Sequence, residues 1–551
     1  MRKLIFLFLI GITFRGVAQI KFNNPILSGF YPDPSVTKVG SDYYLVNSTF
    51  SYFPGIPVFH SQDLKNWKQI GNVIDRPGQM NFMDNRVSRG LFAPAIHYHN
   101  GLFYVTCTLI DGKGNFVVTA KNPAGPWSDP VWLPQVKGID PSLFFDRDKA
   151  YIVYNSDAPD NKPLYSGHRT IRMYEFDPET LSVRGEEIQL VNGGVDISKK
   201  PVWIEGPHIF KRGEWYYLCA AEGGTSVNHS QVVLRSKSVS GPYLPYENNP
   251  ILTQRNLDPN RKNPVTSAGH AELVEGPDGN TYAVFLAVRP YEGDYYNTGR
   301  ETFIAPVKWE NGWPVINPDS KEIKYSYSAG FKEVKQKDAR PQSGNFSYRI
   351  EFKDKLDPAL LFLRTLDTSW FKLSKTDGLT MNLLPETCMG KANPAFIGKR
   401  LQHIKAKAST ELVFKAKTAN EKAGIMIFQN EYHFYYLCRS VVDGKSVLQV
   451  LKGDQDQKKA TLIKQVEISG NNKVYLQIET NGDKCNFQYA TQTDKWKLLL
   501  GDVDGKYLST KVAGGFVGSL FALYATSSGE ASQNVAGFKW LDYAGNDEIY
   551  R

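Results

Sequence analysis

Hydrophobic and polar residues alternate in short runs along most of the chain, and within the first 320 residues this alternation repeats. Each copy has a short apolar run, a turn with Gly, Asp or Asn, and a second run rich in Tyr, Phe and β-branched residues. This is the pattern of a β-hairpin. The copies occupy residues 33–49, 93–109, 140–156, 205–222 and 269–288. Helical periodicity is nearly absent, so the sequence predicts an all-β protein.

A second pattern recurs between the hairpins. "TAKNPAGPW" (119–127) and "RSKSVSGPY" (235–243) share a small residue, a lysine and Gly-Pro before an aromatic ring, and "HSQDLKNWKQIG" (60–71) takes the same place in the first copy. Short alternating runs then supply a third and a fourth strand. Five such units predict a five-bladed β-propeller over residues 20–320. The alternative, a large sandwich with accidental internal similarity, does not explain why alternation, turns and spacing repeat together.

The pattern changes after residue 318. Residues 321–342 are polar and are predicted to form a linker. In residues 343–551, alternating strands such as "TELVFKAK" and "KVYLQIE" follow without the repeat, which predicts an antiparallel β-sandwich. An exposed aromatic face of this sandwich would suit a polysaccharide, although alternating aromatic residues more often belong to a core.

Composition and charge narrow the function classes. The formal net charge of +9 is spread without long basic runs, and no nucleic-acid-binding motif is present, so we interpret the charge as solubility. Aromatic residues make up 13% of the chain, which suits strand-rich cores and surfaces that stack on sugar rings. The five cysteines are far apart and show neither a disulfide framework nor metal-ligand spacing.

The first 18 residues have the layout of a signal peptide. A basic start is followed by an apolar run from Leu4 to Phe14 and by small residues up to Ala18. This run is shorter than the roughly 20 residues that a spanning helix needs, and Arg15 interrupts it. We therefore expect cleavage after Ala18, export to a periplasm or out of the cell, and no membrane span in the mature chain.

The repeat also groups acidic residues. In a propeller the first strand of each blade lines the central channel, so equivalent positions meet at one end of the axis. Asp33, Asp140, Glu205 and His270 lie at or within one residue of this position, and Ala93 fills it in the remaining copy. Alignment on the prolines places Glu205 one residue before the aspartates. Carboxylates gathered in a partly desolvated pocket have pKa values that are pushed apart, which yields the acid and the base that glycoside hydrolysis requires.

Each of these residues also has a purely structural interpretation. Asp-Pro is a common turn or capping sequence, so Asp33 or Asp140 alone would be structural more often than catalytic. A lone His270 would more often be a satisfied core or surface histidine. Glu205, in "WIEGPHIF", is harder to explain as a turn residue. Recurrence on separate copies is what favours a shared site.

At these residues the sequence resembles glycoside hydrolase family 43, which includes β-xylosidases and α-L-arabinofuranosidases that act on xylan and arabinoxylan. "YPDPSV", "GIDPSLF", "IEGPHIFK", "SAGHAELVE" and "NTGRETFIAPVKW" match family blocks in order, and the resemblance covers nearly the whole mature chain. It implies a five-bladed propeller followed by a concanavalin-like β-sandwich, one loop of which closes a side of the catalytic funnel. No cofactor is expected to be required.

The resemblance implies a role for each carboxylate. Asp33 matches the general base, Glu205 the general acid, and Asp140 a third carboxylate that positions the acid and raises its pKa. Inversion at the anomeric carbon by one attack of water is implied as well.

Further residues match the sugar-binding part of the family site. Arg300, in "TGRETF", matches an arginine that hydrogen-bonds the hydroxyls of the terminal sugar; a salt bridge to Glu301 or to Glu292 is the alternative. Phe50 matches an aromatic wall of the pocket, and Phe92 stands where many members carry Trp, although both also suit a core.

His270 matches a histidine on the propeller axis that in relatives contacts water or a bound calcium ion. The chain shows no calcium loop of the EF-hand type, so a structural Ca²⁺ on the axis is allowed by the resemblance but is not indicated by the residues.

We therefore expect an exported, exo-acting, inverting glycosidase that removes terminal β-D-xylose from xylooligosaccharides. An α-L-arabinofuranosidase acting on arabinoxylan or arabinan side chains is the near alternative, because xylopyranose and arabinofuranose present similar hydroxyl geometry. A retaining relative acting on fructosyl bonds is a third alternative. A non-catalytic carbohydrate-binding propeller is more distant, since it predicts that at least one carboxylate is lost, whereas all three are present.

Overall fold

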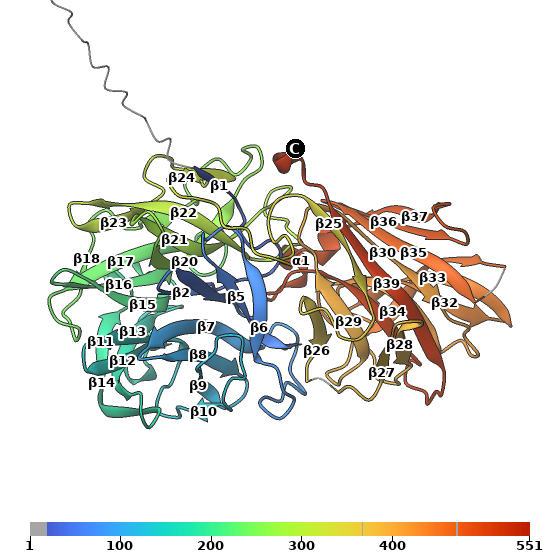
Figure 1. Cartoon of the computed structure of the whole chain (residues 1–551), viewed down its shortest axis with the longest axis horizontal. Coiled ribbons are helices and arrows are strands. Elements are labelled where there is room, and N and C mark those ends of the chain that lie inside the picture. Colours follow the sequence, from blue (N-terminus) through green and yellow to red (C-terminus); the bar gives the residue numbers. More distant parts are fainter. Residues whose placement is uncertain (1–18, 366, 470–471) are drawn as a thin grey trace, which may run out of the picture.

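The computed structural model describes residues 19–365, 367–469 and 472–551, and these residues form two β-rich domains side by side (Figure 1). The expected signal peptide, residues 1–18, lies outside the described residues. Of the helices that are described, none is both long and apolar enough to cross a membrane.

The N-terminal domain is built from four-stranded blades, each numbered here from its inner to its outer strand. The first blade contains β2 (Ser35–Val39), β3 (Asp42–Val46), β5 (Gly55–Ser61) and β6 (Lys68–Ile74), and the second contains β7 (Gly90–His99), β8 (Leu102–Ile110), β9 (Gly114–Ala120) and β10 (Val131–Trp132). The third blade contains β11 (Ile139–Asp146), β12 (Lys149–Asp157), β13 (Arg169–Asp177) and β14 (Ser182–Asn192), and the fourth contains β15 (Glu205–Arg212), β16 (Trp215–Glu222), β17 (Ser230–Ser236) and β18 (Leu244–Pro245), with β19 (Leu252–Thr253) paired to β17. The fifth blade contains β20 (Thr266–Glu275), β21 (Thr281–Val288), β22 (Glu301–Glu310) and β23 (Trp313–Ile316).

The blades close into a ring. Strand β2 contacts β7 and β20, β11 contacts β7 and β15, and β15 contacts β20, so the inner strands surround one axis. Strand β1 (Ile20–Asn23) pairs with β24 (Ser326–Ala329), which lies inside the segment expected to be a linker. The prediction of a five-bladed β-propeller is confirmed in the described residues.

A backbone kink recurs at or near the start of every inner strand. One residue there has a positive φ, which residues other than glycine rarely adopt. The angles are 52° at Asp33, 38° at Ala93, 56° at Asp140, 57° at Gly206 and 53° at His270. In the first four blades these residues directly precede the aligned prolines, and in the fifth blade His270 precedes Ala271. Gly206 is therefore the backbone equivalent of the two aspartates, and Glu205 precedes the kink.

The C-terminal domain is a sandwich of two sheets. The first sheet contains β25 (Phe346–Glu351), β27 (Phe371–Ser374), β28 (Gly378–Asn382), β30 (Lys405–Val413), β35 (Lys473–Asn481), β36 (Lys484–Ala490), β37 (Lys497–Asp504) and β39 (Val535–Gly545). The second sheet contains β26 (Leu360–Leu363), β29 (Ala395–Arg400), β31 (Lys422–Phe428), β32 (Phe434–Val442), β33 (Lys445–Asp454), β34 (Lys459–Glu467) and β38 (Leu520–Thr526). Apolar side chains from both sheets fill the space between them, as alternating strands predict.

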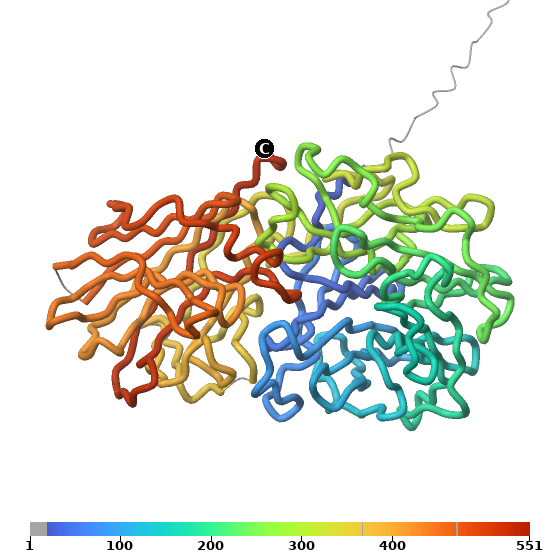
Figure 2. The backbone as a smooth tube through the Cα atoms, turned by 180° about the vertical axis from the view of Figure 1, so that it is seen from behind, coloured from blue at the N-terminus to red at the C-terminus, as the bar shows by residue number. Residues whose placement is uncertain are grey.

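The two domains lie directly against each other (Figure 2). Strand β4 (Tyr52–Phe53) of the propeller pairs with β26 and so extends the second sheet of the sandwich. Arg364 of the sandwich is fully buried, and its Nη2 lies 2.8 Å from Oε1 of Glu431. The same carboxylate accepts a hydrogen bond from the backbone N–H of Val87 in the propeller. Buried charges of this kind persist only where they are paired. The interface therefore fixes the position of the sandwich on the propeller.

Candidate active site

A pocket of about 510 Å³ opens where the inner strands of the propeller begin. It is lined by Asp33, Arg89, Phe92, Ala93, Ile110, Ile139, Asp140, Arg169, Trp203, Glu205, Gly224, Thr225, His270, Arg300 and Phe516. The three carboxylates that the repeat singles out thus come together in one pocket, although they lie on three separate blades. All three are at least nine-tenths buried.

Asp33 is held as a charged group. Its Oδ2 accepts a 2.6 Å hydrogen bond from the Ser48 hydroxyl, Nη1 of Arg300 lies 3.3 Å from its Oδ1, and Nδ1 of His270 lies 3.9 Å from the same oxygen. Burial disfavours the charge, but Arg300, His270 and Ser48 together outweigh burial and hold the pKa of Asp33 below its ordinary value. Asp33 is therefore a carboxylate throughout the neutral range.

Glu205 and Asp140 show the opposite behaviour. Burial raises the pKa of Glu205, and the negative charge of Asp140 raises it further. Burial and the charge of Asp33 likewise raise the pKa of Asp140. Oδ2 of Asp140 accepts a 3.0 Å hydrogen bond from the backbone N–H of Gly206, the residue after Glu205. One pocket thus combines a carboxylate with two neighbouring carboxyl groups that retain protons more strongly than usual.

Arg300 faces Asp33 and not the neighbouring glutamates. Glu301 instead receives two hydrogen bonds from Arg289, at 2.6 and 2.8 Å, and Glu292 pairs with Lys506 at 2.7 Å. The alternative of a salt bridge from Arg300 to one of these glutamates is therefore wrong. Nε of Arg300 is buried without a hydrogen-bond partner among the described residues. Arg300 also lines the pocket, so its guanidinium group borders the space that a sugar would occupy.

Two phenylalanine rings line the pocket, and a third supports them from behind. Phe92 and Phe516 line the pocket, with their ring centres 5.6 Å apart. Phe50, which we expected in the wall, is only 1% exposed and is not a lining residue. It supports the wall instead, since its ring centre lies 5.4 Å from that of Phe92 and 6.3 Å from that of Phe516.

Phe516 comes from the other domain. It belongs to the segment between the short helix α1 (Thr510–Ala513) and β38 of the sandwich, and the guanidinium carbon of Arg300 lies 5.3 Å from its ring centre. The sandwich therefore supplies one side of the pocket. Sequence reasoning placed a loop of this domain here through the resemblance, but no pattern in the residues singled out Phe516.

Arg169 and Trp203 are further pocket residues that sequence reasoning missed. Nε of Arg169 donates to Oδ1 of Asn155 at 2.9 Å, and its guanidinium carbon lies 4.6 Å from the Trp203 ring centre. Trp203 is 37% exposed at the mouth of the pocket. Neither residue has a counterpart in the other blades, so the repeat did not mark them. One signal in the sequence could have identified Trp203. It stands two residues before Glu205, and residues two apart in an extended chain point to the same side.

His270 is buried beside Gly206. Burial lowers the pKa of His270 to about 4, so its ring is neutral at neutral pH. A Cβ at Gly206 would lie 2.8 Å from Nε2 of His270, which explains why glycine occupies this place in the fourth blade. No group of three or more His, Cys, Asp or Glu side chains within the described part of the chain is arranged to hold a metal ion. A calcium ion near His270 stays a prediction.

The fold and the pocket together define a class of enzyme. Glycoside hydrolysis needs one carboxyl group that gives a proton and one carboxylate that activates water, and the split in pKa between Glu205 and Asp33 provides this pair. Comparison with known proteins agrees with this class. The chain belongs to the glycosyl hydrolases family 43, whose profile matches residues 22–314, and residues 349–544 match the β-xylosidase C-terminal concanavalin A-like domain. The family and the concanavalin-like C-terminal domain, both predicted from the sequence motifs, are thus confirmed.

Relatives match over nearly the whole chain. A xylosidase/arabinosidase of Butyrivibrio fibrisolvens is 38% identical over 94% of this chain and 98% of its own. A non-reducing-end α-L-arabinofuranosidase of Bacteroides ovatus is 36% identical over 98% of both chains. Among solved structures, a family 43 protein from a capybara gut metagenome is 41% identical with a TM-score of 0.85, covering 92% of this chain and 95% of its own. The xylan β-1,4-xylosidase of Bacillus halodurans is 28% identical with a TM-score of 0.85, covering 95% and 100%.

Proposed function

We propose that this glycoside hydrolase is an exo-acting, inverting β-xylosidase that releases terminal β-D-xylose from xylooligosaccharides. The observation that carries the proposal is the ionised Asp33 in one pocket with Glu205, whose pKa is raised. Phe516 of the sandwich supports exo action, because it covers one side of the pocket and so favours a chain end over the middle of a chain.

The residues account for each step of the proposed reaction. Asp33 takes a proton from a water molecule while the oxygen of that water attacks the anomeric carbon. Glu205 gives its proton to the glycosidic oxygen as the bond between this oxygen and the anomeric carbon breaks. Asp140 is tied to the Gly206 N–H and keeps the pKa of Glu205 high. Arg300 binds the hydroxyls of the terminal sugar. Water and protons are the only participants, so we propose that no cofactor is required.

Substituting the acid gives a test with two arms. Glu205→Gln removes the proton but keeps the shape, so we expect kcat on xylobiose to fall by about 10²–10⁴-fold. A dinitrophenyl xyloside has a leaving group that departs without protonation, so its hydrolysis should be far less affected. Asp33→Asn should abolish the hydrolysis of both substrates.

Glu214→Gln is the matched control. Glu214 lies on the turn of the same blade, is exposed and pairs with Lys237 at the surface. It should leave both activities unchanged. If Glu205→Gln loses both substrates equally, Glu205 is not the proton donor.

The relatives support a second candidate, the α-L-arabinofuranosidase. The Bacteroides ovatus protein bears that name, and the Butyrivibrio fibrisolvens protein is named for both activities. Time-resolved NMR on β-1,4-xylobiose and on an arabinoxylooligosaccharide separates the two functions. The same spectra show the anomer of the first product, and retention of configuration would refute the inverting mechanism and favour a retaining enzyme.

Export completes the proposal. We propose that residues 1–18 are removed and that the mature enzyme works in the periplasm or outside the cell, with the sequence layout as support. N-terminal sequencing of protein from the native host tests this, and a mature N-terminus at Gln19 is expected.

A further inference from the structure

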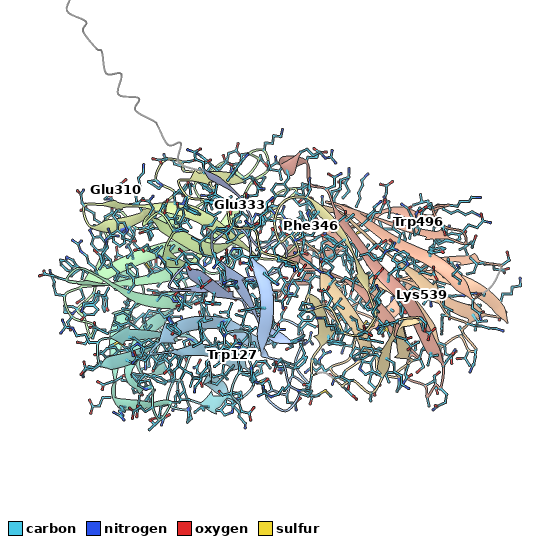
Figure 3. The ribbon with its side chains drawn as sticks, in the orientation of Figure 1. Trp127, Glu310, Glu333, Phe346, Trp496 and Lys539 are labelled. Carbon is cyan, nitrogen blue, oxygen red and sulfur yellow. The ribbon has the colours of Figure 1, made fainter. Side chains whose placement is uncertain are left out.

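A second groove crosses the outer face of the first sheet of the sandwich. It measures about 440 Å³ and shares no lining residue with the catalytic pocket. Strands β25, β39, β30 and β35 and the loop before β37 form it, and Figure 3 shows Trp496 of that loop on the part of the sandwich away from the propeller. The proposed hydrolysis does not use this groove.

One line of polar side chains runs along the groove, across the strands. Direct cross-strand pairing joins Arg349 to Asp542, Asp542 to Ser409, and Ser409 to Gln477. Cross-strand partners point to the same face, so the four side chains form a row over four neighbouring strands. With strands about 4.8 Å apart, the row is about 14 Å long. That length suits a short stretch of a linear polymer.

Aromatic rings run beside this row. Trp540 and Tyr475 lie two residues before Asp542 and Gln477 on their strands and therefore on the same outer face. Their ring centres are 6.5 Å apart, with only 26° between the ring planes. Trp496 adds a third ring from the loop.

Trp540 and Trp496 are not core residues, whereas Tyr475 is only 8% exposed. The neighbouring Leu476 and Leu541 are at most 1% exposed and point into the sandwich, whereas Trp540 and Trp496 are half-buried. The guanidinium carbon of Arg349 lies 4.2 Å from the Trp540 ring centre, and Arg349 holds both oxygens of Asp542 at 2.6 Å. The polar groups are thus already oriented before any ligand arrives.

We infer that this groove is an accessory binding site for a xylan chain. Pyranose rings offer C–H faces that pack on aromatic rings and hydroxyls that bond to planar amide, carboxylate and guanidinium groups, and the groove sets both in parallel rows. A peptide ligand is disfavoured, since Ala544 is the only aliphatic side chain among the lining residues of the groove. The choice of xylan rests on the proposed function; the choice of a saccharide rests on the groove.

Binding to polymer tests the inference separately from hydrolysis. The full chain with Glu205→Gln is run in native gels that contain soluble arabinoxylan, with excess xylobiose present to occupy the catalytic pocket. Retardation by arabinoxylan but not by dextran is expected. When Trp496→Ala or Trp540→Ala is added to the Glu205→Gln protein, each should weaken the apparent affinity for arabinoxylan by about threefold to tenfold. Trp132→Ala is the matched control, because Trp132 is also half-buried with a nearby lysine but lies on the propeller outside both sites.

Each outcome decides the inference. In the active enzyme, Trp496→Ala should leave kcat/KM on p-nitrophenyl β-D-xylopyranoside unchanged and slow the release of xylose from polymeric xylan. Equal retardation of the groove variants and of Trp132→Ala would overturn the inference, as would retardation by dextran. If arabinoxylan does not retard the Glu205→Gln protein, the inference is overturned as well. In that case, normal hydrolysis of p-nitrophenyl β-D-xylopyranoside by the active enzyme would still leave the proposed function standing.

Discussion

The Ser48 hydroxyl should set the acidic limit of catalysis. It donates to Oδ2 of Asp33 at 2.6 Å, and both residues are buried. A hydrogen bond to a charged group contributes about 1.5–3 kcal/mol. One pKa unit corresponds to about 1.4 kcal/mol, so Ser48→Ala should raise the pKa of Asp33 by about one to two units. Arg300 and His270 remain and still hold that pKa down.

The sign of the effect follows from the role of Asp33. The base works only when it is charged, so activity falls as the pH drops through its pKa. A higher pKa in Ser48→Ala moves the acidic limb of the kcat/KM profile to higher pH. The alkaline limb reports loss of the proton from Glu205 and should stay in place. The assay is the hydrolysis of p-nitrophenyl β-D-xylopyranoside across the pH range in which circular dichroism shows a folded protein.

Ser51→Ala separates this effect from general damage. The Ser51 hydroxyl is equally buried and donates to the backbone oxygen of Arg89 at 2.7 Å, without touching Asp33. Ser51→Ala loses one buried hydroxyl hydrogen bond, whereas Ser48→Ala loses two, because the Ser48 hydroxyl also accepts from the backbone N–H of Ala93 at 2.7 Å. The free energy of unfolding should therefore fall more in Ser48→Ala, and the pH profile is what separates the two variants. The acidic limb should move only in Ser48→Ala. If the two profiles coincide, Asp33 is not the base that limits activity at low pH.

Three further substitutions test other parts of the structure. Arg169 lowers the pKa of Glu205 by its charge, so Arg169→Met should move the alkaline limb of kcat/KM to higher pH; an unmoved limb refutes this link. Phe516→Ala removes one aromatic wall and should raise KM on xylobiose by about threefold to tenfold, measured by initial rates. Arg364→Met leaves the buried Glu431 charge unpaired and should lower the free energy of unfolding by about 3–5 kcal/mol in urea titrations, whereas a loss below 1 kcal/mol contradicts the buried pairing.

The propeller could be predicted because its blades repeat a local signal. Each hairpin carries its alternation and its turn within about 17 residues, so the pattern needs no knowledge of distant contacts. Prolines even marked the backbone register, since Asp33 and Asp140 have positive φ angles like Gly206 in the structure. The strands of the sandwich could likewise be predicted from local alternation of polar and apolar residues. Its sheet order was not predictable, because strands such as β30 and β39 are far apart in the chain.

The site was predictable only where it follows the repeat. Asp33 and Asp140 stand at equivalent positions, and Glu205 lies one residue away. Phe50 shows the limit of this reasoning, since an aromatic residue in a motif can support a wall without lining it. Phe516 reaches the pocket across more than 400 residues from Phe92, and no periodicity encodes such a contact.

The start of strand β22, directly after Arg300, links the chemistry to the domain interface. Arg300 faces the pocket, while the next residue, Glu301, faces away from it and is fully buried. Glu301 accepts hydrogen bonds from the backbone N–H of Gly29 at 2.7 Å and from Arg289, and Arg289 also bonds Asp547 near the end of the chain. The last residues of the sandwich thus hold the strand that presents Arg300.

A second contact acts on the other side of Arg300. A Cβ on Gly299 would lie 2.7 Å from the backbone nitrogen of Gly518, so two glycines allow the loop with Phe516 to pack directly against this strand. Arg300 and Phe516 are therefore positioned by one interface. Removing the sandwich would take away the wall and also the support of the arginine, which explains physically why two domains are needed to build one sugar pocket.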